Sequence, residues 1–176
     1  RYLQSEVPER MLQCQKIMVM PLRRHTQRPV GHLSKEELTQ ILAHPDATTQ
    51  AGRRDAVMLS VLYDTGARVQ ELIDLNANDV RLTSPAQVRL LGKGRKVRVV
   101  PLMDATAQLL RDHMREHELD RPDRSHLPLF QNRHGGRLSR SGVRYVLQCH
   151  VQAARTLLPD FTQKVSPHNL RHTKGM

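Results

Sequence analysis

The chain has 176 residues, which is enough for one domain with a hydrophobic core. Hydrophobic residues make up 38% of it, a share that favours a globular domain over a disordered chain. Lys and Arg number 28 against 17 Asp and Glu, for a formal net charge of +11. This excess favours a polyanionic partner such as a nucleic acid, although a merely soluble basic protein is the plainer alternative.

The sequence also predicts where the protein works. No apolar run is long enough to span a bilayer, and no signal peptide is visible, so we expect no membrane partner. Cys14 and Cys149 lie in no metal-ligand spacing. We therefore interpret both as reduced packing residues and expect a cytoplasmic protein.

Three segments are predicted in chain order. Residues 1–20 have the pattern of a short amphipathic helix, which we interpret as a possible tail of a preceding domain. Residues 21–30 hold two prolines and several cations and are expected to form a basic linker. Residues 31–176 are expected to form the main domain. Because the chain begins with Arg1 and its last residues have helical character without a cap, we expect a fragment that is incomplete at its C-terminus.

The first half of the main domain is predicted to be helical. Ser34 is followed by Glu37 three residues later, the pattern of a capping box at the start of a helix. Residues 52–64 are apolar nearly all round, which is typical of a buried helix. Gly66 is expected to end that helix, and Arg68 to open a new helical stretch.

A β-hairpin is predicted next. Residues 87–91 and 96–100 are short runs rich in β-branched residues, and Gly92-Lys93-Gly94-Arg95 turns between them. Helices return after it, so the fold class predicted is mainly α with a small antiparallel β-sheet (α+β).

Two further helices are predicted after the hairpin. Asp104 is expected to cap a helix that runs to about Glu118, with its inward residues being Leu109, Leu110 and Met114. Ser139 is expected to cap another helix, whose apolar side consists of Val143, Val146, Leu147 and Val151. Its opposite side repeats polar residues every four positions, namely Arg140, Arg144 and Gln148.

Candidate phosphate ligands lie at two helix starts. Ser166 and Pro167 are good residues for beginning a helix, and they would place His168 and Arg171 on one face of its first turn. Free N–H groups and the dipole at that end attract phosphate, and a guanidinium can hold two phosphate oxygens. Arg68 is a second candidate, with Glu71 one turn beyond it to orient it. Alone, either arginine could instead be a chance spacing or form an ordinary ion pair.

Two basic clusters add to this set. Lys93 lies between two glycines at the predicted hairpin tip, where it could reach into a groove and donate a proton. The cations that follow it are Arg95, Lys96 and Arg98, and those of the second cluster are Arg133, Arg137, Arg140 and Arg144. Contact with a phosphate backbone is the functional interpretation of both clusters. For the first cluster the alternative is edge protection of the hairpin, and for the second a solvated helix face remains equally open.

Taken together, the motifs resemble the tyrosine recombinase, or phage integrase, family. The resemblance lies in Thr-Gly-x-Arg-x-x-Glu-Leu at 65–72, in Gly-Lys-Gly-x-Lys-x-Arg-x-Val-Pro-Leu at 92–102, and in His-x-Leu-Arg-His-Thr at 168–173. It covers roughly residues 30–176 and implies the catalytic-domain fold of that family.

The resemblance also implies a mechanism. A tyrosine hydroxyl attacks a DNA phosphate, which forms a 3′-phosphotyrosyl link and releases a 5′-hydroxyl. By position, Arg68 and Arg171 would hold the non-bridging oxygens, Lys93 would be the general acid, and His168 would act as acid and base. Glu71 matches an accessory position. Neither a cofactor nor a metal is implied, and the partner is double-stranded DNA, bound by a tetramer on paired recombination sites.

The resemblance fails at the end of the chain. The family places a further His or Trp, and then the nucleophilic tyrosine, after the last motif, whereas only Thr173-Lys174-Gly175-Met176 follow here. Tyr2, Tyr63 and Tyr145 do not fit that place, and we interpret the last two as packing residues. We therefore expect a recombinase catalytic domain, from a mobile element or phage, that binds DNA without cleaving it.

Two alternatives remain open at this point. The first is a non-catalytic DNA-binding or regulatory relative, and the second, more remote, is a type IB topoisomerase.

Overall fold

The structure is a computed structural model, which describes residues 11–20 and 31–175. Helix α2 (Met11–Val19) lies inside the helix that the sequence predicts over residues 1–20. The rest of that prediction, and the predicted linker at 21–30, fall outside the described residues.

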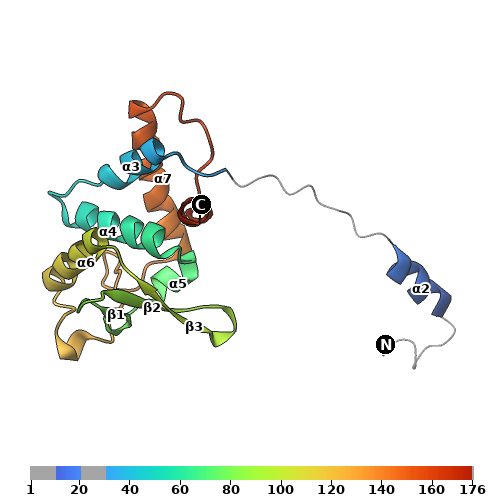
Figure 1. The fold of residues 1–176 in the computed structure, drawn as a ribbon, viewed down its shortest axis with the longest axis horizontal. Coiled ribbons are helices and arrows are strands. Elements are labelled where there is room, and N and C mark those ends of the chain that lie inside the picture. The colour runs from blue at the N-terminus through green and yellow to red at the C-terminus, as the bar shows by residue number, and fades with distance from the viewer. Residues whose placement is uncertain (1–10, 21–30, 176) are drawn as a thin grey trace.

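The main part of the fold consists of helices around one small sheet (Figure 1). The helices are α3 (Lys35–Ala43), α4 (Gln50–Thr65), α5 (Val69–Ile73), α6 (Asp104–Glu116), α7 (Arg140–Leu157) and α8 (Pro167–Lys174). The strands are β1 (Val80–Arg81), β2 (Gln87–Leu91) and β3 (Val97–Pro101), and the short 3-10 turns are η2 (Ala77–Asp79), η3 (Lys93–Arg95) and η4 (Pro122–Arg124). The predicted fold class, mainly α with a small antiparallel sheet, is confirmed.

Helix α3 begins with the predicted capping box. The Ser34 hydroxyl accepts the backbone N–H of Glu37 at 3.1 Å, and the Glu37 carboxylate accepts the backbone N–H of Ser34 at 2.7 Å. Two N–H groups that the helix leaves free are thereby satisfied.

Helix α4 is the central helix of the fold, and α3, α6 and α8 all pack against it (Figure 1). Its side chains are buried on several sides, as the apolar sequence predicts. The helix ends at Gly66, whose φ of 55° is left-handed and suits a residue without a β-carbon.

The sheet has the order β1-β2-β3 and is antiparallel throughout. Val88 and Leu90 of β2 are fully buried against the core, whereas Val97 and Val99 of β3 are about half exposed on the other face. The hairpin prediction is confirmed, with β3 beginning one residue later than expected. Strand β1 pairs with the outer edge of β2 and was not predicted.

The start and inward face of α6 differ from the prediction. Met103, not Asp104, is the N-cap residue, and Asp104 is the first residue of the helix. The Met103 N–H donates a hydrogen bond to the Asp64 carboxylate of α4 at 2.8 Å, so a side chain from another helix caps the start of α6. Leu109 is 36% exposed because the buried row runs through Ala107, Leu110 and Met114, to one side of it.

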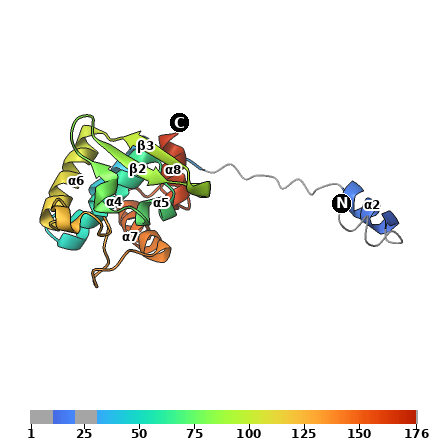
Figure 2. The same cartoon turned by 90° about the horizontal axis from the view of Figure 1, so that it is seen from below.

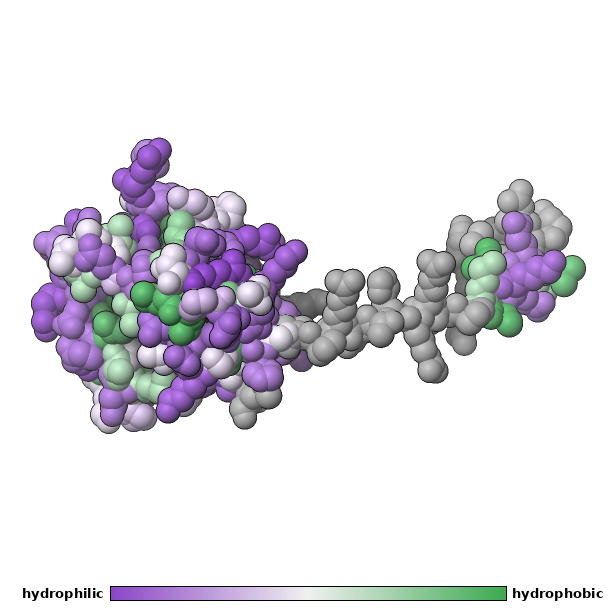
Figure 3. Space-filling model, turned by 90° about the horizontal axis from the view of Figure 1, so that it is seen from above, coloured by the Kyte–Doolittle hydropathy of each residue, from purple (hydrophilic) through white to green (hydrophobic). Residues whose placement is uncertain are grey.

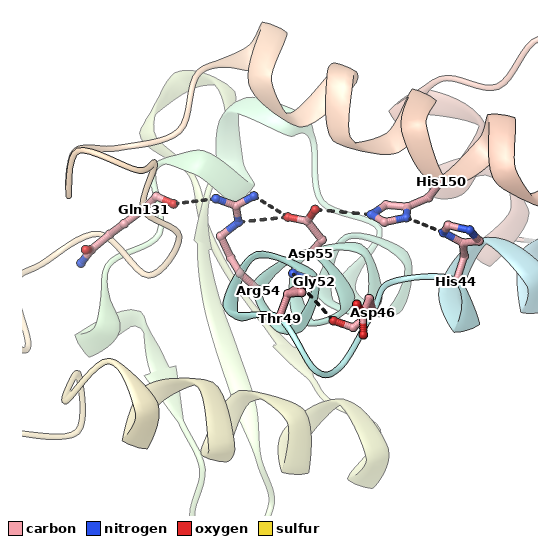
Figure 4. A network of polar contacts seen from close by, with 8 residues as sticks. All are labelled: His44, Asp46, Thr49, Gly52, Arg54, Asp55, Gln131 and His150. Atoms are coloured by element: carbon pink, nitrogen blue, oxygen red, sulfur yellow. Dashed lines mark hydrogen bonds and ion pairs between the residues drawn. The ribbon is translucent and has the colours of Figure 1, made fainter.

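Helix α7 begins as predicted, with the Ser139 hydroxyl accepting the Gly142 N–H at 3.0 Å. A polar network ties it to two other helices (Figure 4). Asp55 of α4 is bonded by its neighbour Arg54 at 2.6 Å and lies 3.4 Å from the ring of His150 in α7. The second ring nitrogen of His150 lies 3.0 Å from His44, at the end of α3. The predicted apolar side of α7 is buried.

Seen from two directions, α5, α8 and the tip of the β2–β3 hairpin lie at the same end of the fold (Figures 1 and 2). Hydrophilic residues cover most of the face shown in Figure 3, with small apolar patches between them. None of the helices within the described residues is sufficiently long and apolar to cross a membrane.

Candidate functional site

Arg68 is placed by the turn that joins α4 to α5. Gly66 ends α4, Ala67 is buried, and Arg68 is the extended N-cap residue of α5. Its backbone N–H donates to the Glu71 carboxylate at 2.9 Å, and its guanidinium donates to the same carboxylate at 2.8 Å. The Arg68 side chain is 54% exposed, so it can also meet a ligand from solvent.

Glu71 is the buried partner of two arginines. Its side chain is 4% exposed, and a third hydrogen bond reaches it from the Arg98 guanidinium of β3 at 2.7 Å. Burial alone would raise the pKa of Glu71. The hydrogen bonds from Arg98 and from the backbone and guanidinium of Arg68 outweigh burial and lower the pKa from 4.5 to about 2. Glu71 is therefore an anion whose charge is balanced inside the protein.

Helix α8 presents the second half of the site. Ser166 is its N-cap and Pro167 its first residue, as the sequence predicts. The Ser166 hydroxyl donates to Asn169 Oδ1 at 2.6 Å, and the Ser166 N–H donates to the same oxygen at 2.9 Å. His168 follows on the exposed side of the first turn, and its ring meets that of His172 edge-on, with centroids 4.6 Å apart.

Arg171 is the half-buried member of the site. Its side chain passes Gly66, where a β-carbon would lie 3.8 Å from the Arg171 Cγ atom. Its Nη1 atom is buried and has no hydrogen-bond partner among the residues that the structure describes. A buried guanidinium nitrogen without an acceptor is costly, and a phosphate oxygen would supply the acceptor.

A pocket of about 760 Å³ joins these groups. Its lining includes Arg68 from the start of α5, His168 and Arg171 from α8, and Arg140 and Arg144 from α7. No carboxylate is found among the described residues that line it. Four arginines around one open pocket produce a positive potential suited to a phosphate group.

The other predicted site residues lie around this pocket or outside it. Lys93 begins the turn η3 at the hairpin tip, and its side chain is outside what the structure describes. Arg95 and Lys96 are exposed on the same hairpin, and Arg133 is exposed in the loop before α7, donating to the ring of His134 at 3.0 Å. Arg98 instead bonds Glu71. The roles given to these residues remain predictions.

Sequence reasoning missed Tyr145 as a residue of the pocket. Tyr145 is 71% exposed and lines the pocket, so its interpretation as a packing residue is wrong. It lies one helical turn beyond Ser141 on α7, beside the row formed by Arg140 and Arg144, and that spacing could have identified it. Cys149, one turn further on, is likewise exposed and free rather than packed.

No group of three or more His, Cys, Asp or Glu residues suited to a metal ion occurs within residues 11–20 and 31–175. The polar groups of the pocket are nearly all cationic or neutral donors. Such groups match an anionic ligand.

Comparisons with known proteins show the family of the chain. The model of the phage integrase family matches residues 32–176. The putative integrase/recombinase y4rC of Sinorhizobium fredii is 38% identical over 177 residues, which cover 100% of this chain and 52% of the relative. The tyrosine recombinase XerD of Staphylococcus epidermidis is 37% identical over 145 residues, which cover 80% of this chain and 46% of the relative.

A solved structure of the XerH site-specific recombinase, bound to its palindromic difH substrate, matches with a TM-score of 0.70 and 25% identity. The match covers 87% of this chain and 43% of that chain. The chain thus spans about half the length of the relatives that it matches. The predicted recombinase fold is confirmed, and the chain belongs to the phage integrase family.

Proposed function

We propose that this chain carries the phosphate-binding half of the active site of a site-specific DNA recombinase or integrase. The observation that carries the proposal is the pocket in which Arg68, His168 and Arg171 meet, with one buried Arg171 nitrogen lacking an acceptor in the described part of the chain. A DNA phosphate would accept from both arginines at once.

In the proposed reaction a tyrosine hydroxyl attacks the DNA phosphate. Its oxygen forms a bond to phosphorus, the bond to the 5′-oxygen breaks, and a 3′-phosphotyrosyl link remains. Arg68 and Arg171 stabilise the charge that develops on the non-bridging oxygens. Lys93 gives a proton to the leaving 5′-oxygen, and His168 positions the phosphate and, as the base, takes the proton of the attacking tyrosine hydroxyl. Rejoining reverses these steps with the 5′-hydroxyl of a second strand.

The proposed partner is double-stranded DNA in the cytoplasm. The proposed contacts with the DNA backbone come from three places. They are Arg140 and Arg144 on α7, Arg95 and Lys96 on the hairpin, and Arg133 in the loop before α7. Full-length protein is proposed to act as a tetramer on paired sites. The XerH structure, a recombinase bound to DNA, supports the choice of partner.

A binding experiment tests whether Arg68 and Arg171 bind the DNA phosphate. We expect Arg171→Ala and Arg68→Ala each to weaken binding of the chain to a short duplex, and to lower the slope of log affinity against log salt by about 1. Arg121→Ala is the control, because it removes a cation that is as exposed as Arg68 and that pairs only with surface acids. Equal losses in all three variants would refute the site.

A trapping experiment tests the cleavage step. We expect the 176-residue chain to form no SDS-resistant adduct with a nicked duplex. Of the tyrosines in the described residues, only Tyr145 lines the pocket, so Tyr145→Phe is the control. An adduct that disappears in Tyr145→Phe would overturn this expectation and make Tyr145 the nucleophile. If a longer polypeptide carries a tyrosine after the last motif and still forms no adduct, the non-catalytic DNA-binding function is favoured instead.

A further inference from the structure

Arg98 faces the inside of the hairpin. It pairs in register with Leu90, which is fully buried, whereas its neighbours Val97 and Val99 point to the exposed face. Because side chains alternate along a strand, Arg98 shares the inner face with Leu90. Its side chain is 36% exposed, and its guanidinium is directed at Glu71 rather than at open solvent.

Glu71 joins Arg98 to Arg68 through one carboxylate. Its Oε1 atom accepts from the Arg68 guanidinium at 2.8 Å, while Oε2 accepts from the Arg68 backbone and from Arg98, at 2.9 and 2.7 Å. A β-carbon on Gly92 would stand 3.3 Å from Oε1, so the start of the hairpin turn lies against the same carboxylate. One buried anion therefore contacts a proposed phosphate ligand and the turn that leads to Lys93.

The buried charge of Glu71 explains why Arg98 matters to Arg68. A buried carboxylate requires compensation, and leaving it unpaired is strongly unfavourable. With Arg98 present, two guanidinium groups share the charge of Glu71. Without Arg98, Arg68 would be its remaining cationic partner and would be held more tightly, with less of its guanidinium free for a phosphate.

We propose that Arg98 is a positioning residue: by pairing with Glu71 it leaves the Arg68 guanidinium available to the DNA phosphate. This inference rests on the proposed function of Arg68 as a phosphate ligand. It differs from a direct contact between Arg98 and the DNA backbone, which the basic sequence of the hairpin suggests equally well.

A double-mutant cycle separates the two roles. If Arg98 acts through Glu71, Arg98→Met should weaken duplex binding by about tenfold, and the double variant Arg98→Met/Glu71→Gln should return to within about threefold of the parent chain. The double variant has the net charge of the parent chain, so its salt slope should also match. If Arg98 contacts phosphate directly, the double variant should keep a loss of affinity and a slope lower by about 1.

Arg89 and Asp79 form the matched control pair. Arg89 lies on the same sheet and donates to the Asp79 carboxylate at 2.7 Å, but neither residue bonds Arg68. Arg89→Met removes the same charge as Arg98→Met, and Arg89→Met/Asp79→Asn restores it. We expect this cycle to be additive. If both cycles show the same recovery, net charge alone explains it and the positioning role is wrong.

Two further measurements keep the test decisive. Thermal unfolding of every variant identifies any that fails to fold. If Arg98→Met fails to fold, Arg98→Lys replaces it: lysine keeps the charge but lacks the guanidinium that bonds Glu71, so this variant should bind the duplex less tightly than the parent chain. The parent chain and Arg68→Ala are measured in parallel. If Arg68→Ala binds as well as the parent chain, the proposed function of Arg68 has failed. If Arg68→Ala is impaired but the Arg98 and Glu71 cycle is additive, only the present inference has failed.

Discussion

The side-chain amide of Asn169 donates a hydrogen bond to the backbone carbonyl of Gly31 at 2.7 Å, across 138 residues of sequence. The same side chain accepts two hydrogen bonds from Ser166 through its oxygen, at 2.6 and 2.9 Å. Asn169 therefore begins α8 and also attaches it to the segment that leads into α3. His168 and Arg171 lie on either side of Asn169, so this attachment helps to hold the proposed phosphate site.

Substitution of Asn169 separates the two contacts. Asn169→Ala removes both the cap and the link to Gly31, and we expect it to lower the free energy of unfolding by about 1–2 kcal/mol. Asn169→Asp keeps the acceptor for Ser166 and adds a charge favoured near a helix N-terminus, so it should cost less. Urea unfolding measures both. If both variants lost the same free energy of unfolding, the hydrogen bonds between Ser166 and residue 169 would contribute nothing to stability.

Thr173 and Thr39 make a second matched pair. Each hydroxyl donates to the carbonyl four residues earlier, at 2.9 Å for Thr173 and 2.7 Å for Thr39. Only Thr173 also accepts the backbone N–H of Leu33, at 2.9 Å. Thr173→Val should therefore leave the partly buried Leu33 N–H without an acceptor. We expect it to lower the free energy of unfolding by about 1–3 kcal/mol more than Thr39→Val does.

Amide hydrogen exchange gives an independent readout of this link. The Leu33 amide should exchange faster in Thr173→Val and at the parent rate in Thr39→Val. An unchanged Leu33 rate in both would contradict the link between α8 and the segment before α3.

Gly52 and Gly142 occupy equivalent positions, each three residues after the hydroxyl that caps its helix (Figure 4 shows Gly52). A β-carbon on Gly52 would lie 2.0 Å from the carbonyl oxygen of Asp46, whereas on Gly142 it would lie 3.3 Å from the Ser139 hydroxyl. We expect Gly52→Ala to destabilise the fold by about 1–3 kcal/mol, because the backbone at Asp46 would have to move to make room for the methyl group.

Gly142→Ala is the control for Gly52→Ala. Alanine is favoured over glycine inside a helix by roughly 1 kcal/mol, so this variant should be neutral or slightly stabilising. Thermal melts of the two variants decide the matter, and a Gly52→Ala melting temperature at or above that of the parent chain would contradict the crowding at Asp46.

The features that the sequence predicted correctly depend on neighbours a few residues away. Ser34 and Ser139 cap their helices through N–H groups three residues later, and Gly66 ends α4 by its own backbone angle. Likewise, the spacing of His168 and Arg171 predicted that one helix would carry both, and α8 does, although Arg171 lies in its last turn rather than its first. Local geometry determines such features, so a motif reveals them.

The features that it missed depend on partners chosen by packing. The cap of α6 is supplied by Asp64 from α4, and the partner of Arg98 is Glu71, 27 residues earlier in the chain. A basic hairpin sequence does not indicate which cation faces inward until the register with β2 is known. Tyr145 lies in the predicted Ser139 helix and was interpreted as a packing residue, yet it is exposed and lines the pocket.

The lowered pKa of Glu71 predicts how stability changes with pH. The carboxyl has a pKa of about 2 when folded and 4.5 ordinarily. Because the folded value is the lower one, Glu71 stabilises the fold fully above pH 4.5, and this contribution is lost as the pH falls towards 2. We expect the difference in free energy of unfolding between the parent chain and Glu71→Gln to be constant above pH 4.5 and to shrink below it.

Urea unfolding at a series of pH values tests this window, with Asp74→Asn as the control. Asp74 is an exposed carboxyl at the end of the same helix, where it accepts a hydrogen bond from Gln70. Its variant removes a carboxyl from the same helix and leaves the hydrogen bonds of Glu71 in place. Arg98→Met should raise the lower end of this window and so narrow it, because removing the strongest hydrogen bond that lowers the pKa moves the folded pKa of Glu71 back towards its ordinary value. A parent-minus-Glu71→Gln difference that stays flat from pH 7 to pH 2 would show that Glu71 is not held as a buried anion between the two arginines.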